Sequence, residues 1–414
     1  MRSQRSRVFY GWWVVVTAGV GLFLGYAPVF VYSFGVFVKS FVQEFHSSRT
    51  SISLAFTLAN LMQSLGAPLA GRLVDRFGAR RVILPSTVIF GVVLMSFKYF
   101  STNLWQLYVF FILLGFVGSG AAPVPYGIVV SRWFDKRRGL ALGLMMAGLS
   151  SGAIVMPSIA QHLITLFGWR TAYAIIGFVV LAVSIPVVGI FLKDTPDKMG
   201  LLPDGARNLH DGPAAPSNVQ GMTSHAALRS STFWLMACAF FLVGISVHGC
   251  VIHLVPMLTD RGISVERAAL TSSLLGVALL VGRVLSGCLL DRFHGPYVAA
   301  FLFSGVACGI ALLWTGAGGG LASLAAFLVG LGMGAEADII AYLTSRYFGL
   351  RSFGEIYGYA FGTYTFSGAL GPMLMGVGFD HGGSYRMPLL LFFVATLIAT
   401  VLLTRLGPYT YRAS

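Results

Sequence analysis

Long apolar segments alternate with short polar connections along nearly the whole chain. A helix needs roughly 20 mostly apolar residues to cross a membrane, and twelve segments satisfy this requirement. They cover residues 10–37, 51–72, 81–100, 104–130, 138–165, 171–192, 231–257, 268–290, 296–316, 320–346, 352–378 and 386–407. The pattern predicts an all-α polytopic membrane protein with twelve transmembrane helices.

One polar connection is much longer than the others and divides these helices into two sets of six. It covers residues 193–230 and is rich in Pro, Asp, Gly and Ser. We therefore expect an N-terminal six-helix bundle over 1–192, a cytoplasmic linker over 193–230 and a C-terminal six-helix bundle over 231–414.

Composition and charge support insertion in a lipid bilayer. Of the 414 residues, 56% are hydrophobic and 10% charged, against about 25% charged in soluble domains. The net charge of +14 raises the question of a nucleic-acid partner, but most of the 28 Lys and Arg residues fall at the termini and in the loops after helices 2, 4, 6, 8 and 10. The positive-inside rule then places both termini in the cytoplasm, and no nucleic acid is required. The short loops favour a bacterial inner membrane.

The two halves carry related sequences. "GRLVDRFG" at 71–78 recurs as "GCLLDRFH" at 287–294, and "GSGAAPVPYGIVVSRWF" at 118–134 recurs as "GMGAEADIIAYLTSRYF" at 332–348. Internal repeats of this kind are typical of transporters, whose substrate site lies near the membrane midplane between the halves.

The G-x-L-x-D-R-F loop and its copy resemble the signature of the major facilitator superfamily. Three further stretches are similar to the monocarboxylate transporter family and its bacterial relatives, which include the oxalate/formate antiporters: "YGWWVVV" at 10–16, "RWFDKRRGLALGLMMAGLSSG" at 132–152 and "HLVPMLTDRGIS" at 253–264. The resemblance implies two pseudo-symmetric six-helix bundles, alternating access, and carriage of small carboxylates that is commonly linked to protons.

Arg283 is a cation inside the eighth apolar segment. It precedes Asp291, at the end of that helix, by eight residues, or about 12 Å, which places it near the midplane of a hydrocarbon layer about 30 Å thick. Its mate in the first half is Ala67, so the repeat itself requires no cation there. One interpretation is a permanent structural pair with a carboxylate. The other, which the resemblance also implies, is that the guanidinium binds a substrate carboxylate through its planar fork.

Departures from the family pattern narrow the range of candidate substrates. Leu279 occupies the place of an Asp found in animal monocarboxylate transporters, and Tyr32 that of their proton-accepting Lys. The stretch 357–372 of helix 11 lacks the Lys of the oxalate carriers. One cation suits a monoanion such as lactate or pyruvate better than a dianion.

Two acids lie deep in the tenth segment. Glu336 and Asp338 are about 15 and 12 Å from its cytoplasmic end, and either could carry a coupled proton or pair with Arg283 in the empty carrier. His253, in the outer half of helix 7, is a further candidate for proton coupling because histidine titrates between pH 5 and 8.

Other side chains are candidates for the substrate path and for its gate. Hydroxyl groups that could orient a hydroxy or keto acid belong to Tyr32, Tyr126 and Tyr364, and Phe366 could contact the apolar end of the ligand. Packing or interfacial placement explains these aromatic residues equally well. The two motif loops and "DKRRG" at 135–139 are expected to form the inner gate, through Asp75, Arg76, Arg138, Asp291 and Arg292.

These features predict a secondary active transporter that carries a small monocarboxylate with a proton. The alternatives are a carboxylate exchanger and, less favoured, a drug efflux carrier or a transporter-like sensor. We expect no enzymatic activity, cofactor or metal, and a functional monomer whose partners are the carboxylate anion, the proton and the lipid bilayer.

Overall fold

The computed structural model describes residues 9–99, 103–205, 220–316 and 318–411, and they are almost entirely helical. Within these ranges, β-pairing is limited to an isolated bridge between Gly221 and Gly349. The middle of the predicted linker, 206–219, and the basic start of the chain lie outside the described residues.

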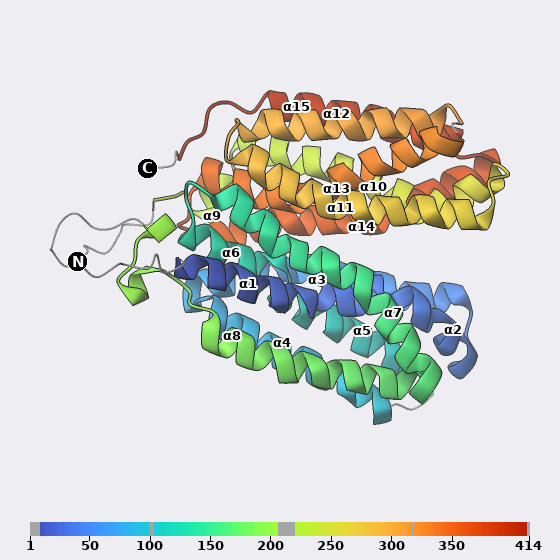
Figure 1. Cartoon of the computed structure of the whole chain (residues 1–414), viewed down its shortest axis with the longest axis horizontal. Coiled ribbons are helices and arrows are strands. Elements are labelled where there is room, and N and C mark those ends of the chain that lie inside the picture. The colour runs from blue at the N-terminus through green and yellow to red at the C-terminus, as the bar shows by residue number, and fades with distance from the viewer. Residues whose placement is uncertain (1–8, 100–102, 206–219, 317, 412–414) are drawn as a thin grey trace, which may run out of the picture.

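The helices form two bodies that follow each other along the chain (Figure 1). The first half contains α1 (Tyr10–Phe23), α2 (Phe34–Glu44), α3 (Arg49–Phe77), α4 (Ala79–Ser96), α5 (Leu104–Gly118), α6 (Pro123–Trp133), α7 (Arg138–Val179) and α8 (Ile185–Phe191). A short α9 (Ser224–Leu228) precedes the second half, which contains α10 (Ser231–Asp260), α11 (Val265–Leu290), α12 (Gly295–Trp314), α13 (Gly319–Phe348), α14 (Phe353–Gly382) and α15 (Arg386–Thr404).

Several predicted spans are less regular than the apolar pattern suggested. The first predicted span contains α1, a π-helical turn over Ala27–Tyr32 and the start of α2. The fourth is divided by a 3₁₀ turn ahead of Pro123. Between the fifth and sixth spans the chain turns at Gly168, whose φ of 76° favours glycine. The apolar pattern does not indicate the first two breaks, because a π-helical or 3₁₀ turn alters the backbone without interrupting the run of apolar residues. The turn at Gly168 falls between two predicted spans.

Ten helical stretches in the described part of the chain are long and apolar enough to cross a membrane. One of them, 138–191, contains two of the predicted spans on either side of Gly168. α14, which is rich in Gly and Tyr, supplies the remaining span. The prediction of an all-α membrane protein is therefore confirmed.

The halves contact each other mainly through α3 with α14 and α7 with α11. We call the end at which α1 begins and α15 ends the basal end, and the opposite end, at which α2 lies, the distal end (Figure 1). At the basal end Gly71 packs on Gly354, and Gly139 on Gly287, so closely that a Cβ at any of them would overlap the facing backbone. Such small residues let membrane helices approach each other.

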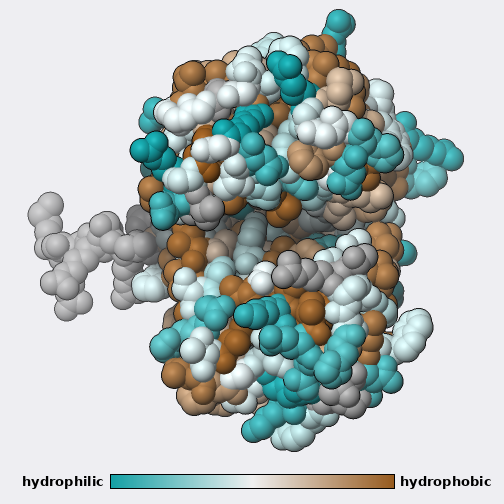
Figure 2. Space-filling model, turned by 90° about the vertical axis from the view of Figure 1, so that its right-hand side faces the viewer, coloured by the Kyte–Doolittle hydropathy of each residue, from teal (hydrophilic) through white to brown (hydrophobic). Residues whose placement is uncertain are grey.

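The distal end has a different shape. Figure 2, which views the molecule from that end, shows a hollow between the two halves. The contacts of Gly71, Gly139, Gly287 and Gly354 all lie near the basal ends of their helices. The halves are thus joined at the basal end and parted at the distal end.

Candidate functional site

Arg283 lies on α11, seven residues before its end, at the boundary between the two halves of the protein. Its side chain is buried, and its Nη1 lies 3.5 Å from Oδ1 of Asp338 on α13. Its Nε donates a hydrogen bond to the hydroxyl of Ser150 on α7, in the first half. Asp338 therefore supplies a carboxylate partner for Arg283.

The ion pair of Arg283 and Asp338 is loose. A bidentate pair forms two parallel N–H···O bonds of about 2.7–2.9 Å, whereas here one contact is 3.5 Å long. The second carboxylate oxygen of Asp338, Oδ2, has no hydrogen-bond partner in the described part of the chain. Guanidinium has five N–H donors, so Arg283 retains donors for a second carboxylate.

Glu336 is the second buried acid near this guanidinium. It is fully buried, and within the described ranges neither of its carboxylate oxygens accepts a hydrogen bond of good geometry. Arg283 and the hydroxyl of Tyr364 lie close enough to interact with it electrostatically. Tyr32, from the first half, lies within electrostatic range of both Arg283 and Glu336. We call Tyr32, Ser150, Arg283, Glu336, Asp338 and Tyr364 the Arg283 cluster.

The structure adds polar residues that the sequence did not single out. Ser150 lies in "GLSSG" on α7, where the sequence alone gives no reason to single out its hydroxyl. Tyr357 on α14 is buried within electrostatic range of both Asp338 and Arg283. Ser286 lies one turn after Arg283 and donates to its carbonyl oxygen at 3.0 Å. Tyr357 lies seven residues before Tyr364, two helical turns, which is the signal that could have identified it.

Three predicted site residues lie elsewhere. The hydroxyl of Tyr126 packs against Gly21 of α1. Phe366 is 38% exposed and stacks on Phe241 with ring centroids 6.4 Å apart. His253 Nε2 lies 3.1 Å from the carbonyl oxygen of Pro372, towards the distal end. In the part of the chain that the structure describes, none of the three has a recorded contact with Arg283, and their roles stay predictions.

A different histidine lies nearer to the cluster. The ring of His248 on α10 is 5.5 Å, between centroids, from that of Tyr364. Its Nδ1 lies 2.8 Å from the carbonyl oxygen of Gly244, one turn earlier in the same helix. The backbone contact occupies Nδ1. The other ring nitrogen, Nε2, lies on the side of Tyr364 and Gly368.

Two motif aspartates join the halves at the basal end. The carboxylate of Asp75, near the end of α3, accepts the backbone N–H groups of Gly354 (3.1 Å) and Glu355 (3.0 Å) at the start of α14. The carboxylate of Asp291, just after α11, accepts those of Gly139 (2.7 Å) and Leu140 (2.9 Å) at the start of α7.

Both aspartates therefore bind the first turn of a helix in the other half, where unpaired N–H groups and the helix dipole favour an anion. Burial raises the pKa of the Asp291 carboxyl, and its two backbone donors oppose that rise. The two contacts are related by the sequence repeat: the aspartate of each motif loop binds the start of the corresponding helix in the other half.

The gate arginines divide into two groups. Arg138 donates to Ser345 at 3.0 Å, and Arg346 pairs with Asp135 at 2.8 Å, so both join the first half to the second. Arg76 and Arg292 are instead exposed. Asp75 also lies 3.7 Å from Arg132 of its own half, whereas its contacts with the backbone of α14, those of Asp291 with the backbone of α7, and the Asp135–Arg346 pair all join the two halves. Sequence spacing cannot show this, because the partner groups come from the other half.

The contacts of Asp75 and Asp291 predict that the two halves move apart at the basal end when these contacts are removed. Replacing Asp75 and Asp291 together with Asn removes two charged acceptors, each worth about 1.5–3 kcal/mol. We expect spin labels at Arg72→Cys and Arg351→Cys, both exposed basal positions, to shift towards longer distances in a background without native cysteines. Asp197→Asn, at an exposed basal residue, should leave the distances unchanged. An unaltered distribution in the double variant would contradict the gate assignment.

A second prediction concerns Ser150, which positions the guanidinium of Arg283. Ser150→Ala leaves a buried charged N–H without its acceptor, and we expect it to weaken the binding of a small anion at Arg283 roughly ten-fold. Ser151→Ala is the matched control, because the Ser151 hydroxyl donates within its own helix to Ala147. Equal affinities of the two variants for the anion, measured by calorimetric titration of the purified protein, would remove Ser150 from the site.

Comparison with known proteins gives relatives with the same sequence pattern. The chain is 26% identical over 390 residues to monocarboxylate transporter 11 of Homo sapiens, covering 92% of this chain and 80% of that protein. It is 29% identical over 310 residues to monocarboxylate transporter 13 of Bos taurus, covering 74% of this chain and 65% of that protein. The chain thus spans slightly less than two thirds of the length of that second relative.

Solved structures share the fold at low sequence identity. The human organic anion transporter MFSD10 matches with a TM-score of 0.73 at 15% identity, over 95% of this chain and 99% of that chain. The proton:xylose symporter XylE matches with the same TM-score and identity, over 97% of both chains. The family model of the Major Facilitator Superfamily matches residues 18–372. The chain is therefore a membrane transporter that belongs to the major facilitator superfamily.

Proposed function

We propose that this protein carries a small monocarboxylate, of the lactate or pyruvate type, together with a proton by alternating access. The observation that supports this most strongly is the buried Arg283, held between the halves by one loose ion pair and a serine hydroxyl. The names of the relatives, which are monocarboxylate transporters, agree with a carboxylate substrate.

Charge balance in the Arg283 cluster supports coupling to a proton. With Glu336 and Asp338 both ionised, the three charged groups sum to −1, and a bound monocarboxylate would make the sum −2. An uncompensated buried charge is costly, so entry of the anion favours protonation of one acid. We assign the proton to Glu336, whose oxygens have no good hydrogen bond in the described residues, and we assign to Asp338 the role of releasing Arg283 to the substrate.

The position of the cluster supports a role in the conformational change. Arg283 already bonds to Ser150 across the boundary between the halves, so a carboxylate bound there contacts both. We propose that the two halves, 1–192 and 231–414, move as units, with the basal contacts breaking as the distal hollow closes. By the positive-inside rule the basal end faces the cytoplasm, and the structure then corresponds to an outward-facing state.

Purified protein in liposomes tests the proposal. With an inward proton gradient, we expect labelled lactate to accumulate, and a protonophore to abolish the accumulation. Formate, oxalate and an amphipathic drug are compared in the same assay. Uptake only into vesicles preloaded with a carboxylate would support exchange instead, and transport of the drug without any carboxylate would overturn the proposal.

A further inference from the structure

A cavity at the basal end of the first half is independent of the Arg283 cluster. It has a volume of about 790 Å³ and lies between the start of α4 and the segment that follows α8. Its lining combines basic and apolar side chains: Arg80, Arg81, Leu84, Pro85, Leu192, Lys193, Asp194 and Met199. We propose that this cavity binds the head group of one anionic phospholipid.

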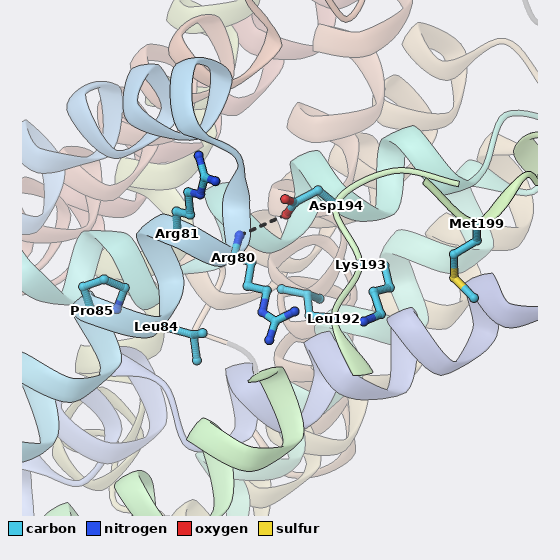
Figure 3. A pocket seen from close by; sticks show the side chains of 8 residues that line it. All are labelled: Arg80, Arg81, Leu84, Pro85, Leu192, Lys193, Asp194 and Met199. Atoms are coloured by element: carbon cyan, nitrogen blue, oxygen red, sulfur yellow. Dashed lines mark hydrogen bonds between the residues drawn. The ribbon is translucent and has the colours of Figure 1, made fainter. Parts of the chain in front are cut away.

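The charges of the cavity favour an anion. Figure 3 shows the guanidinium of Arg80 and the ammonium of Lys193 extending into the same space, while Arg81 lies on another side of the first turn of α4. The carboxylate of Asp194 accepts the backbone N–H of Arg80 at 3.0 Å and lies against Gly78. It is therefore directed at the start of α4. The lining thus carries three cations and one carboxylate that binds backbone, a net charge of +2.

An apolar groove begins where the basic cavity ends. A second cavity of about 380 Å³ shares Arg81 and Pro85 with the first and is otherwise lined by Leu73, Phe77, Val82 and Ser86. Leu73 and Phe77 on α3 are 37% and 46% exposed, as expected for side chains that contact lipid. Acyl chains can pass from the basic cavity into this groove beside Arg81 and Pro85, which line both, whereas a soluble phosphate cannot fill the groove.

The location of the cavity also favours an anionic phospholipid. In a membrane, the start of α4 lies at the boundary between head groups and hydrocarbon, where basic pockets between helices bind anionic head groups. The sequence repeat places Pro296 and Tyr297 in the second half at the positions of Arg80 and Arg81. The two basic residues of α4 therefore have no repeat counterparts, and the site is expected once in each chain.

Native mass spectrometry of the purified full-length protein tests the site. We would titrate it with phosphatidylglycerol and, separately, with phosphatidylcholine of the same acyl chains. Each cation near anionic lipid contributes about 1 kcal/mol, or roughly a five-fold change in affinity. We expect wild type to prefer phosphatidylglycerol, and Arg80→Ala/Lys193→Ala to bind it roughly 30-fold more weakly. Arg80→Lys should retain most of the affinity.

Arg405→Ala is the matched control, because it removes one exposed basal cation from the second half and should leave the lipid preference unchanged. Equal melting temperatures establish that the double variant is folded. Soluble glycerol phosphate is the third probe, and we expect it to bind far more weakly than the lipid. The proposal is overturned if wild type shows no preference between the lipids, if the double variant keeps that preference, or if glycerol phosphate binds as tightly as phosphatidylglycerol.

Discussion

Replacing Arg283 with alanine should abolish carboxylate transport. Truncating one partner of a buried charged hydrogen bond costs about 2–5 kcal/mol, so we expect uptake to fall more than a hundred-fold at low substrate concentration. Arg283→Lys keeps the charge but loses the planar fork and the Nε donor to Ser150. We expect uptake by this variant to fall at least ten-fold. The measurement is the initial rate of labelled lactate uptake into liposomes. Arg267→Ala, an exposed arginine of the same helix, should transport like wild type.

A second variant separates a substrate anchor from a purely structural cation. Arg283→Ala leaves Asp338 buried without its partner, which can destabilise the protein by itself. Arg283→Ala/Asp338→Asn removes both charges and should restore the melting temperature while transport stays absent. If this folded double variant carried lactate, Arg283 would be a structural residue and the anchor hypothesis would be wrong.

Replacing Glu336 with glutamine should uncouple transport from protons. Glutamine has nearly the same shape but cannot carry the proton, so we expect lactate accumulation under a proton gradient to disappear. Exchange of external for internal lactate, which needs no net proton movement, should persist at a rate within about ten-fold of wild type. Both activities are measured in the same liposomes, without and with internal lactate.

Glu266→Gln, at an exposed position in the first turn of α11, is the matched control and should leave both activities unchanged. Accumulation by Glu336→Gln that still depends on the proton gradient would assign the proton to another group. Asp338 and His248 would then be the next candidates, since Asp338 pairs with Arg283 and His248 lies beside Tyr364.

The architecture was predictable because lipid imposes a strong pattern on the chain. Twenty-residue apolar spans and the repeated D-R-F loop were sufficient to place α3, α11 and their neighbours. The breaks near Pro28 and Pro123 were not predictable in detail, since the apolar runs continue through them, whereas the turn at Gly168 falls between the predicted spans 138–165 and 171–192. Their effect depends on how the backbone satisfies its hydrogen bonds locally.

The central residue of the site was also predictable, and its partners only in part. Arg283 was identified because a cation in an apolar helix is rare and its repeat mate is Ala67. Counting residues along a helix gives the depth of a side chain in the membrane but not which neighbouring helix the side chain points towards. It therefore could not decide between Glu336 and Asp338 as the partner, or show that Ser150 of the first half contacts Arg283. Contacts between helices far apart in sequence depend on how the two halves pack.

Proton uptake on substrate binding tests the central claim most directly. Calorimetric titration of the purified protein with lactate, in buffers of different ionisation enthalpy, gives the number of protons taken up per anion bound. We expect about one proton per lactate in wild type, and no binding heat in Arg283→Ala. Lactate binding without proton uptake, or unchanged binding by the Arg283→Ala variant, would contradict a proton-coupled anion site at Arg283.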